Sequence, residues 1–294
     1  MTGPDESSND DSTLAEGVEP AAAYEANKAW WDEITGPHTR SNFYDMEGFK
    51  AGRNRFLQPY IVDEVGDVAG KSLLHLQRHI GQDTISWARL GASVTGVDFG
   101  KEAIAFARAL ATEEALDATF VQSNIYDIGD RFDGQFDIVF TSYGVLAWLH
   151  DLPEWGRIAA RALKPGGIFY IADFHPLADT LQFDKPIETA ADAHPANPYF
   201  DPGAPVLNPA DEEADYASDH ATGLDTYEWF HSLQDILMAL IDAGLQIELF
   251  HEQDFSVYRM REGMIVDSRG LWRLPETVPP LPLMFSIRAR KPGN

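Results

Sequence analysis

Hydrophobic and polar positions in the middle of the chain predict strands that alternate with helices. Mostly apolar runs of strand length lie at residues 72–76, 92–98, 119–122, 136–142 and 168–172. Between them, apolar residues recur at helical spacing, most clearly at residues 101–115. The run at 136–142 is rich in β-branched and aromatic residues, which is typical of a central strand covered on both faces. This alternation predicts an α/β fold with a mainly parallel sheet.

The C-terminal third predicts a further helix and two further strands. Ser232 is a suitable N-cap, and Asp235 stands at the third position of the helix that would follow it. Residues 245–249 and 283–287 alternate between apolar and polar side chains, as strands do when one face is buried. We therefore expect seven strands in all.

The composition divides the chain into five segments. Residues 1–23 are acidic and small, with no basic residue, and predict a disordered tail. Residues 24–56 are rich in aromatic residues and are expected to cap a core that spans residues 57–175. Seven prolines lie between residues 173 and 222, which excludes a regular helix or central strand there. We interpret residues 176–226 as an irregular lid over the substrate, and residues 227–294 as the helix and strand pair that complete the core.

Composition limits the partners and the compartment. The chain has 294 residues, no cysteine and a formal net charge of −25. The lack of cysteine excludes disulfides, thiolate metal sites and a cysteine nucleophile, and the negative charge disfavours nucleic-acid binding. No apolar run is long enough to span a membrane, and the N-terminus shows no leader sequence. We expect a cytoplasmic protein with no nucleic-acid or membrane partner, whose oligomeric state the sequence does not indicate.

The excess of acidic residues, 47 Asp and Glu against 22 Lys and Arg, is typical of a salt-adapted protein. We hypothesise that high salt stabilises the fold because it screens the repulsion between like charges. Equal melting temperatures at low and at molar salt would contradict this hypothesis.

The strongest functional signal lies at residues 71–100. The apolar run at 72–76 leads into a polar turn at 77–82, and a helix-length segment then ends before Gly91. The next apolar run ends in Asp98. A strand, a loop, a helix and a second strand with an acid at its tip form the unit that holds a nucleoside by its ribose hydroxyls.

The loop of this unit separates two classes of cofactor. A dinucleotide needs the pattern G-x-G-x-x-G, because its pyrophosphate approaches the backbone closely. Gln77, Arg78 and His79 occupy the places of glycines here, and only Gly81 is left. A pyrophosphate would therefore fit poorly. S-adenosylmethionine (SAM) carries no phosphate and requires only one close backbone approach.

The segment resembles motif I of the class I SAM-dependent methyltransferases, in which an acidic and an apolar residue precede G-x-G-x-G. His75 replaces the acid, and Gln77 and His79 replace the first two glycines. The LKPGG turn at residues 163–167 also occurs in many members of this family. The resemblance implies a Rossmann-like, seven-stranded mixed sheet with helices on both faces and a last antiparallel strand. It also implies S-adenosyl-L-methionine as the cofactor.

The resemblance suggests which residues bind that cofactor. Asp98 would hold the ribose, Asn124 would read the adenine amino group, and Ile125 or Tyr126 would flank the ring. A simple turn residue is the alternative interpretation of Asn124. The carboxyl end of the strand at 136–142 is added because ligands bind there in open α/β sheets. The expected cofactor-binding residues are His75, Leu76, Gln77, His79, Gly81, Asp98, Phe99, Asn124, Ile125, Tyr126, Thr141, Ser142 and Tyr143.

Aromatic residues and histidines supply the candidates for substrate binding and catalysis. Aromatic faces attract cations such as a methyl sulfonium. The expected substrate-binding residues are Trp30, Tyr44, Arg53, Tyr143, Trp148, Tyr199 and Tyr227. Alignment of donor and acceptor supplies much of the acceleration of methyl transfer, so a base is needed only if the acceptor must lose a proton. The candidate bases are His150, His175, His231 and Glu228, each with an alternative structural interpretation, and no metal site is expected.

We therefore expect a SAM-dependent methyltransferase that acts on a small molecule. Two other functions stay open. An NAD-type oxidoreductase would share the strand–loop–helix–strand unit and its ribose acid, although the required glycines are missing. A SAM-binding protein without catalysis would account for the altered motif I.

Overall fold

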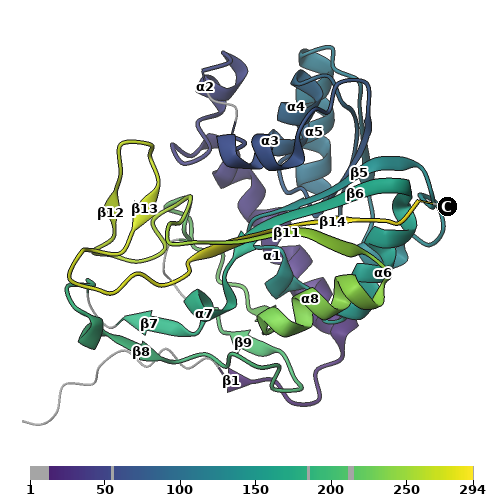
Figure 1. Cartoon of the computed structure of the whole chain (residues 1–294). Helices are drawn as coiled ribbons and strands as arrows, with labels where there is room; N and C mark the ends of the chain where they lie inside the picture. Colours follow the sequence, from purple (N-terminus) through teal and green to yellow (C-terminus); the bar gives the residue numbers. More distant parts are fainter. Residues whose placement is uncertain (1–12, 54–55, 184–185, 211–214, 294) are drawn as a thin grey trace, which may run out of the picture.

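A computed structural model describes residues 13–53, 56–183, 186–210 and 215–293. Its centre is a seven-stranded sheet with the order β11-β14-β6-β5-β2-β3-β4 (Figure 1). Only β14 in this sheet runs antiparallel to its neighbours. The predicted Rossmann-like mixed sheet with a last antiparallel strand is confirmed. The strands are β2 (Ser72–Leu76), β3 (Ser93–Asp98), β4 (Ala118–Gln122), β5 (Phe136–Ser142), β6 (Leu163–Phe174), β11 (Gln246–Gln253) and β14 (Met284–Arg290).

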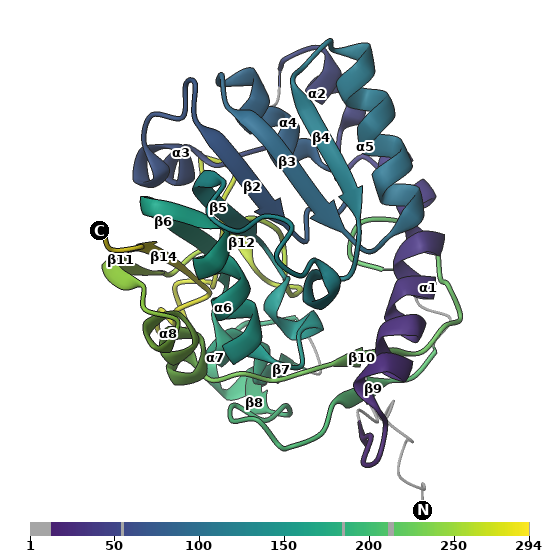
Figure 2. The same ribbon diagram turned by 90° about the vertical axis from the view of Figure 1, so that its right-hand side faces the viewer.

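Helices cover both faces of the sheet because successive side chains of a strand point in opposite directions. Leu73 packs with Trp87 in the layer of α3 (Pro59–Val65) and α4 (Gln82–Arg89). The next residue, Leu74, packs with Trp155 in the layer of α6 (Leu152–Ala162) and α8 (Leu233–Asp242). Helix α5 (Lys101–Glu113) lies beside α4, and its Ile104 packs with Phe120 of β4. Figure 2 shows α6 and α8 together on one side of the sheet.

Side-chain caps fix the starts of two helices, and the predicted cap at Ser232 is confirmed. The Asp151 side chain accepts a hydrogen bond from the Glu154 N–H at the start of α6. Ser232 and Asp235 form a reciprocal capping box at the start of α8. Helices α6 and α8 approach so closely that a Cβ atom at Gly156 would collide with the backbone carbonyl of Ala239. Glycine is therefore required at this crossing.

The N-terminal segment differs from the predicted tail over its described part. Residues Thr13–Leu14 form β1, which pairs with β9 (Val206–Asn208), and β9 pairs with β10 (Thr226–Glu228). Helix α1 (Pro20–Arg40) begins at Pro20, a residue that suits the first helical position. It is followed by the short α2 (Met46–Lys50). The prediction of a tail up to residue 23 is thus wrong for residues 13–23, and residues 1–12 lie outside the described part.

The proline-rich insertion contains more regular structure than predicted. It holds α7 (Pro176–Asp179), the β7 (Leu181–Phe183) and β8 (Ala193–Pro195) hairpin, and β9. Its prolines stand at element ends, such as the first turn of α7 and the end of β8, where proline is tolerated. A second hairpin, β12 (Ile265–Val266) with β13 (Trp272–Arg273), lies near it on the left of Figure 1. The short 3₁₀ helices are η1 (Ile125–Asp127), η2 (Leu146–Trp148) and η3 (Ala190–Asp192).

Strand β6 starts five residues before the predicted 168, so the LKPGG turn belongs to it. The pairing with β5 shifts register between Phe136 and Ile138, which accommodates the extra residues.

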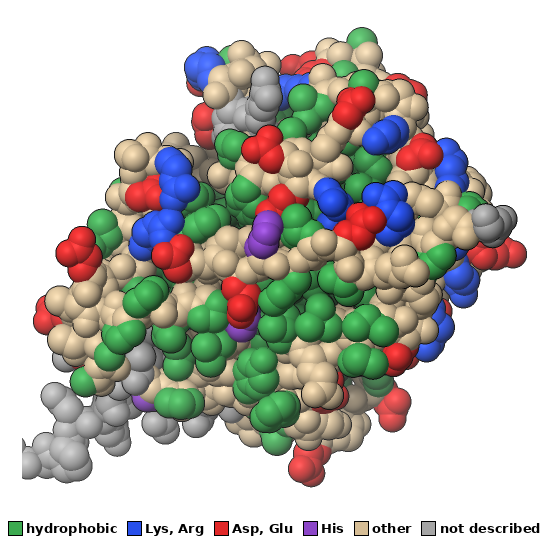
Figure 3. Space-filling view, in the orientation of Figure 1, with side chains coloured by type: hydrophobic (Ala, Val, Ile, Leu, Met, Phe, Trp, Pro, Cys, Tyr) green, Lys and Arg blue, Asp and Glu red, His purple; other side chains and the backbone are tan. Residues whose placement is uncertain are grey.

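One surface feature stands out. Figure 3 shows hydrophobic side chains grouped over α8, where Met238 and Ile241 are 40% and 45% exposed. None of the helices in the described ranges has the length and apolar character needed to cross a membrane.

Candidate functional site

The bend between β2 and α4 keeps a backbone conformation that glycine usually supplies. Gln77 and His79 have φ angles of 55° and 50°, and Gly81 has a φ angle of 86°. A residue with a side chain adopts this left-handed region at a cost of roughly 1–2 kcal/mol. These three residues stand at the three glycine positions of motif I. The bend therefore keeps a glycine-like path although two of the three positions carry side chains.

Asp98 is anchored at the carboxyl end of β3 by this bend. Its Oδ2 accepts from the His79 N–H at 2.8 Å, and its Oδ1 accepts from the Gly100 N–H at 2.8 Å. Burial raises the pKa of Asp98, whereas Arg78 and the two N–H donors oppose that rise. A carboxylate has about four lone-pair sites, so each oxygen can still accept a ligand hydroxyl.

Arg78 is the buried cation beneath the bend. Its guanidinium lies over the Phe120 ring, 4.5 Å from the centroid, and Nη1 donates to the His79 carbonyl at 2.7 Å. Burial lowers the pKa of Arg78 to about 10, and Asp98 acts in the opposite direction. The positive charge of Arg78 thus partly balances Asp98, which favours the ionised carboxylate.

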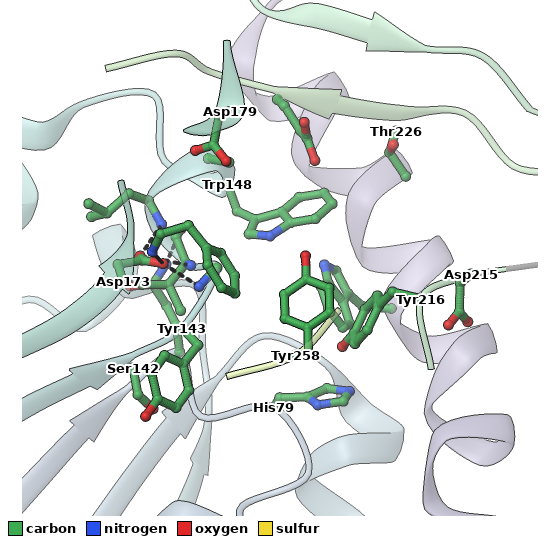
Figure 4. A pocket seen from close by; sticks show the side chains of 18 of the residues that line it. His79, Ser142, Tyr143, Trp148, Asp173, Asp179, Asp215, Tyr216, Thr226 and Tyr258 are labelled. Carbon is green, nitrogen blue, oxygen red and sulfur yellow. Dashed lines mark hydrogen bonds between the residues drawn. The ribbon is translucent and has the colours of Figure 1, made fainter. Parts of the chain in front are cut away.

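Two cavities open at the carboxyl ends of the parallel strands, and Gln77, Asp98, Phe99 and Trp148 line both of them. The larger has a volume of about 1140 Å³. The smaller, about 40 Å³, lies against η1. Figure 4 shows His79, Tyr143, Trp148 and Tyr258 around the space of the larger cavity. This is the edge at which open α/β sheets bind ligands.

Two buried carboxylates support the strand ends beneath the larger cavity. Asp173 accepts from the backbone N–H groups of Gly144, Val145, Leu146 and Phe174, and Figure 4 shows these bonds as dashed lines. Burial nevertheless raises the pKa of Asp173 to about 6. Asp83 accepts from the Ser142 hydroxyl at 2.6 Å, and burial raises its pKa also to about 6.

A second pair of acids faces the larger cavity from the insertion and β10. Burial raises the pKa of Asp179 to about 8, and the charges of Asp173 and Glu228 add to the rise while Arg261 opposes it. Burial also raises the pKa of Glu228. This end of the cavity is therefore less negative than its number of acidic residues suggests.

Comparison with known proteins agrees with this geometry. Residues 79–171 match the family model of a methyltransferase domain. The fold matches an S-adenosylmethionine dependent methyltransferase from Mesorhizobium loti, with a TM-score of 0.54 and 18% identity, over 79% of this chain and 96% of that chain. The chain contains a methyltransferase domain, and its fold is that of the SAM-dependent methyltransferases. The predicted resemblance to SAM-dependent methyltransferases is thus confirmed.

The methyltransferase domain is also similar to two named enzymes. A ubiquinone biosynthesis O-methyltransferase of Erwinia tasmaniensis is 34% identical over 130 residues, which are 43% of this chain and 53% of that protein. The chain thus spans about half the length of this curated relative. The 1,6-didemethyltoxoflavin-N1-methyltransferase of Burkholderia thailandensis has a TM-score of 0.54 and 14% identity, over 96% of this chain and 94% of that chain. At this identity the structure supports the fold alone.

Many of the residues predicted for the methyltransferase site do lie at the two cavities. Asn124 and Ile125 line the smaller one, where Asn124 also caps η1 by accepting from the Tyr126 N–H at 3.1 Å. The larger cavity is lined by Trp30, Tyr44, Gln77, His79, Gly81, Asp98, Phe99, Ser142, Tyr143, Trp148, Tyr199, Glu228 and His231.

Four predicted cofactor-binding residues line neither of these cavities. Leu76 and Thr141 are fully buried within their strands and do not reach the ligand edge. His75 is buried too; its Nδ1 pairs with the Thr84 hydroxyl at 2.8 Å, and burial lowers its pKa to about 3. The Tyr126 hydroxyl donates to the Asp151 carbonyl at 3.0 Å.

Two predicted substrate-binding residues also lie outside the two cavities. Arg53 is exposed, and its guanidinium pairs with Glu47 at 3.3 Å. Tyr227 belongs to β10, where its backbone N–H and carbonyl both bond to the Asn27 side chain at 2.8 Å.

The candidate bases have mainly structural contacts. His150 Nδ1 lies 2.7 Å from the Tyr24 hydroxyl, and His150 lines neither cavity. His175 caps α7 and faces Glu252, with 3.1 Å between Nε2 and the carboxylate. His231 does reach the larger cavity, but its Nε2 donates to the Leu149 carbonyl at 2.7 Å. Of the four candidates, only Glu228 and His231 line the larger cavity. His231 is held by its bond to the backbone, which leaves Glu228 as the candidate with no such bond.

Sequence reasoning missed several residues of the site. His38 is fully buried in α1 and contacts His79 and Asp215. Tyr216 and Tyr258 also line the larger cavity. Nothing in the local pattern marks these residues, because their contacts join segments far apart in the chain. Within the described ranges, no group of three or more histidine or carboxylate side chains is arranged to hold a metal ion.

Proposed function

We propose that the protein transfers a methyl group from SAM to a small-molecule acceptor. The position of Asp98 carries the proposal: it lies at the end of β3, between the two cavities, and is held by the glycine-like bend. A carboxylate at this place can accept from the two ribose hydroxyls of a nucleoside. The methyltransferase domain match supports SAM as the cofactor, with S-adenosylhomocysteine (SAH) as its demethylated product.

The residues around Asp98 suit the rest of that molecule. Phe99, Asn124 and Ile125 line the smaller cavity and would enclose the adenine ring. Because this cavity is only about 40 Å³, its side chains must shift to admit the ring. Gln77 Oε1 is buried and has no hydrogen-bond partner among the described residues. It would accept a hydrogen bond from the ammonium group at the methionine end of SAM. Bound SAM would supply the electrophilic methyl group on its sulfonium.

The acceptor would occupy the rest of the larger cavity. A volume of about 1140 Å³ is slightly above the usual range of small-molecule sites, so it has room for the methionine end of SAM and an acceptor together. Trp30, Trp148 and Tyr258 give it aromatic walls. The O-methyltransferase relative supports a small acceptor, and the described part of residues 176–226 would act as the lid.

Calorimetry with SAH, SAM and NAD tests the proposal. We expect wild-type protein to bind SAH and not NAD. Asp98→Asn should weaken SAH binding by about tenfold or more, because hydrogen bonds to a charged group are worth roughly 1.5–3 kcal/mol. The matched control is Asp117→Asn, which alters an exposed carboxylate whose partner is Ser93 at the opposite end of β3. Tight binding of NAD without binding of SAH would replace this function by the oxidoreductase alternative.

Turnover separates an enzyme from a SAM-binding protein without catalysis. Wild-type protein, radiolabelled SAM and a pool of small metabolites should yield a labelled product. SAH binding without any transfer of label would favour the non-catalytic alternative.

A further inference from the structure

Five polar side chains beside the larger cavity form one continuous hydrogen-bonded chain. His38 Nε2 lies 3.1 Å from Asp215 Oδ2, and His38 Nδ1 lies 3.3 Å from His79 Nε2. His79 Nδ1 lies 3.3 Å from the Tyr44 hydroxyl, which lies 2.6 Å from the Tyr216 hydroxyl. The five residues come from α1, the bend, the turn after α1 and the insertion. We call this chain the tyrosine–histidine relay.

The hydrogen bonds of the relay all point the same way, from Tyr216 toward Asp215. An ionised Asp215 only accepts, so His38 carries its hydrogen on Nε2 and accepts on Nδ1. His79 then donates from Nε2 to His38, and its Nδ1 is free to accept from the Tyr44 hydroxyl. The Tyr44 oxygen in turn accepts from the Tyr216 hydroxyl. Each neutral imidazole thus uses one donor and one acceptor, and no step in the chain conflicts with another.

The charges around the two histidines suit a proton acceptor. Burial raises the pKa of Asp215, but hydrogen bonds from His38, Ala217 and Ser218 outweigh it and hold this pKa below its ordinary value. Burial lowers the pKa of His79; His38 and Arg78 lower it further, and Asp215 opposes them. His79 is therefore neutral at neutral pH, and an ionised carboxylate stands behind His38 to stabilise an imidazolium.

The relay is open at its tyrosine end. Among the described residues, the only hydrogen-bond partner of the Tyr216 hydroxyl is Tyr44. Its oxygen therefore keeps a lone pair for a further donor. Figure 4 shows Tyr216 and His79 on the same side of the larger cavity, with Asp215 farther from its centre. A ligand hydroxyl in the cavity could thus reach the oxygen that starts the chain.

We propose that the tyrosine–histidine relay is the general base of the methyl transfer, and that the acceptor is a small aromatic compound with a phenolic hydroxyl group. This inference rests on the proposed function. The aromatic walls fit an aromatic acceptor. Burial raises the pKa of both Tyr44 and Tyr216, so they pass the proton on and do not keep a charge. A phenol, with an ordinary pKa of about 10, is a weaker acid than an imidazolium, at about 6.5. The ionised Asp215 beside His38 and the simultaneous methyl transfer therefore have to offset the cost of moving the proton.

The proton and electron pairs balance across the step. As the acceptor O–H donates to Tyr216, each relay hydrogen moves one place toward His38, and His38 ends as an imidazolium beside Asp215. The phenolic oxygen forms a bond to the methyl carbon while the bond from that carbon to sulfur breaks, which yields SAH and the methyl ether. The proton on His38 later returns to solvent. Tyr216 would touch the substrate, and the other four residues act through it.

Tyr216→Phe tests the relay with catechol and thiophenol as probes for transfer from radiolabelled SAM. Loss of a general base should lower kcat/KM for catechol by about 100-fold near neutral pH, and the defect should shrink as the pH rises toward the pKa of catechol. Thiophenol ionises far more readily, so its methylation should change little. The control is Tyr170→Phe, which removes a buried hydroxyl that bonds to Glu64 away from both cavities.

Asp215→Asn tests the far end of the relay. It should lower kcat for catechol by about tenfold with an unchanged KM for SAM, because only the imidazolium loses its counter-charge. Equal losses for both probes, or no recovery at high pH, would overturn the relay as a base. Wild-type protein that binds SAH but methylates no hydroxyl probe would overturn the phenolic acceptor. Failure to bind SAH at all would instead overturn the proposed function, and with it this inference.

Discussion

The two walls of the larger cavity are held together by different kinds of contact. The sheet-side wall comprises residues 77–83, 98–100, 142–148 and 173, and its carboxylates accept mainly from nearby backbone N–H groups. The lid-side wall comprises residues 30–44, 197–210 and 215–231. Its contacts join side chains that are 172 positions apart for Tyr44 and Tyr216, and 177 positions apart for His38 and Asp215.

This difference separates two roles within one site. Backbone groups are present whatever the side chain, so the sheet-side wall keeps its shape as long as the sheet forms. The lid-side wall depends on particular side chains that meet only after the insertion folds over α1. A scaffold of this kind can keep one cofactor while its covering segments vary with the acceptor.

The largest expected effect comes from the sheet-side wall. Asp173→Ala should lower the free energy of unfolding by about 3 kcal/mol or more, because the N–H groups of the loop after β5 lose their shared acceptor. Urea unfolding measures it. Asp130→Ala removes an exposed carboxylate and should change stability by less than about 0.5 kcal/mol. Similar values for the two variants would show that Asp173 does not hold this wall.

Asp83 tests the sheet-side wall in another way, because burial makes its ionised carboxylate unfavourable for folding. Its pKa of about 6 in the folded protein lies above its ordinary value, so the folded state binds the proton more tightly. The stability from Asp83 is fully present below about pH 4 and is lost as the pH rises through about 6. Asp83→Asn keeps an acceptor for Ser142 and should stabilise the protein by about 2 kcal/mol near pH 8 but not near pH 4.

Unfolding in urea at both pH values checks this prediction. Because one pKa unit corresponds to about 1.4 kcal/mol, the gain near pH 8 should be readily measurable. An equal gain at the two pH values would mean that packing of the amide, and not the charge of Asp83, causes it.

The lid-side wall should respond locally rather than globally. Asn27 is fully buried, and both ends of its amide bond to the backbone of Tyr227, which joins α1 to β10. Asn27→Ala should cost about 2 kcal/mol and speed hydrogen exchange in α1 and β10 without affecting β2 to β5. Lys28→Ala is the control, since Lys28 forms only a partly exposed pair with Asp32. Faster exchange throughout the sheet would contradict the separation of the two walls.

Sequence patterns predicted the sheet-side wall well because its determinants are local. Residues 136–142 form β5 with the expected bounds, and Asp98 ends β3 and lines both cavities. Two of the errors there share a cause. Leu76 and Thr141 are fully buried strand residues that line neither cavity, whereas Asp98 and Ser142, at the last positions of their strands, do line the larger one.

The lid-side wall could not be predicted in the same way. His38 and Asp215 belong to segments with no shared pattern, and their meeting depends on β1, β9 and β10 pairing beside α1. The sequence indicates His79 only as a cofactor-binding residue at a glycine position of motif I. Its partners Tyr44 and His38 give it a further role that spacing along the chain does not reveal.

The smallest expected effect concerns the backbone of the bend. Gln77→Gly relieves the strain of a φ angle of 55°, while the added freedom of glycine in the unfolded chain offsets the gain. Stability should therefore change by no more than about 1 kcal/mol in urea unfolding, and SAH binding should weaken a fewfold through loss of the amide. Gly81→Ala is the contrasting variant, because its φ angle is 86° and a Cβ atom would lie 2.8 Å from Arg78 Nη1 and 3.0 Å from Ala107 Cβ. If Gln77→Gly proved as destabilising as Gly81→Ala, side-chain contacts rather than the left-handed backbone would hold the bend, and the sheet-side wall would resemble the lid-side wall after all.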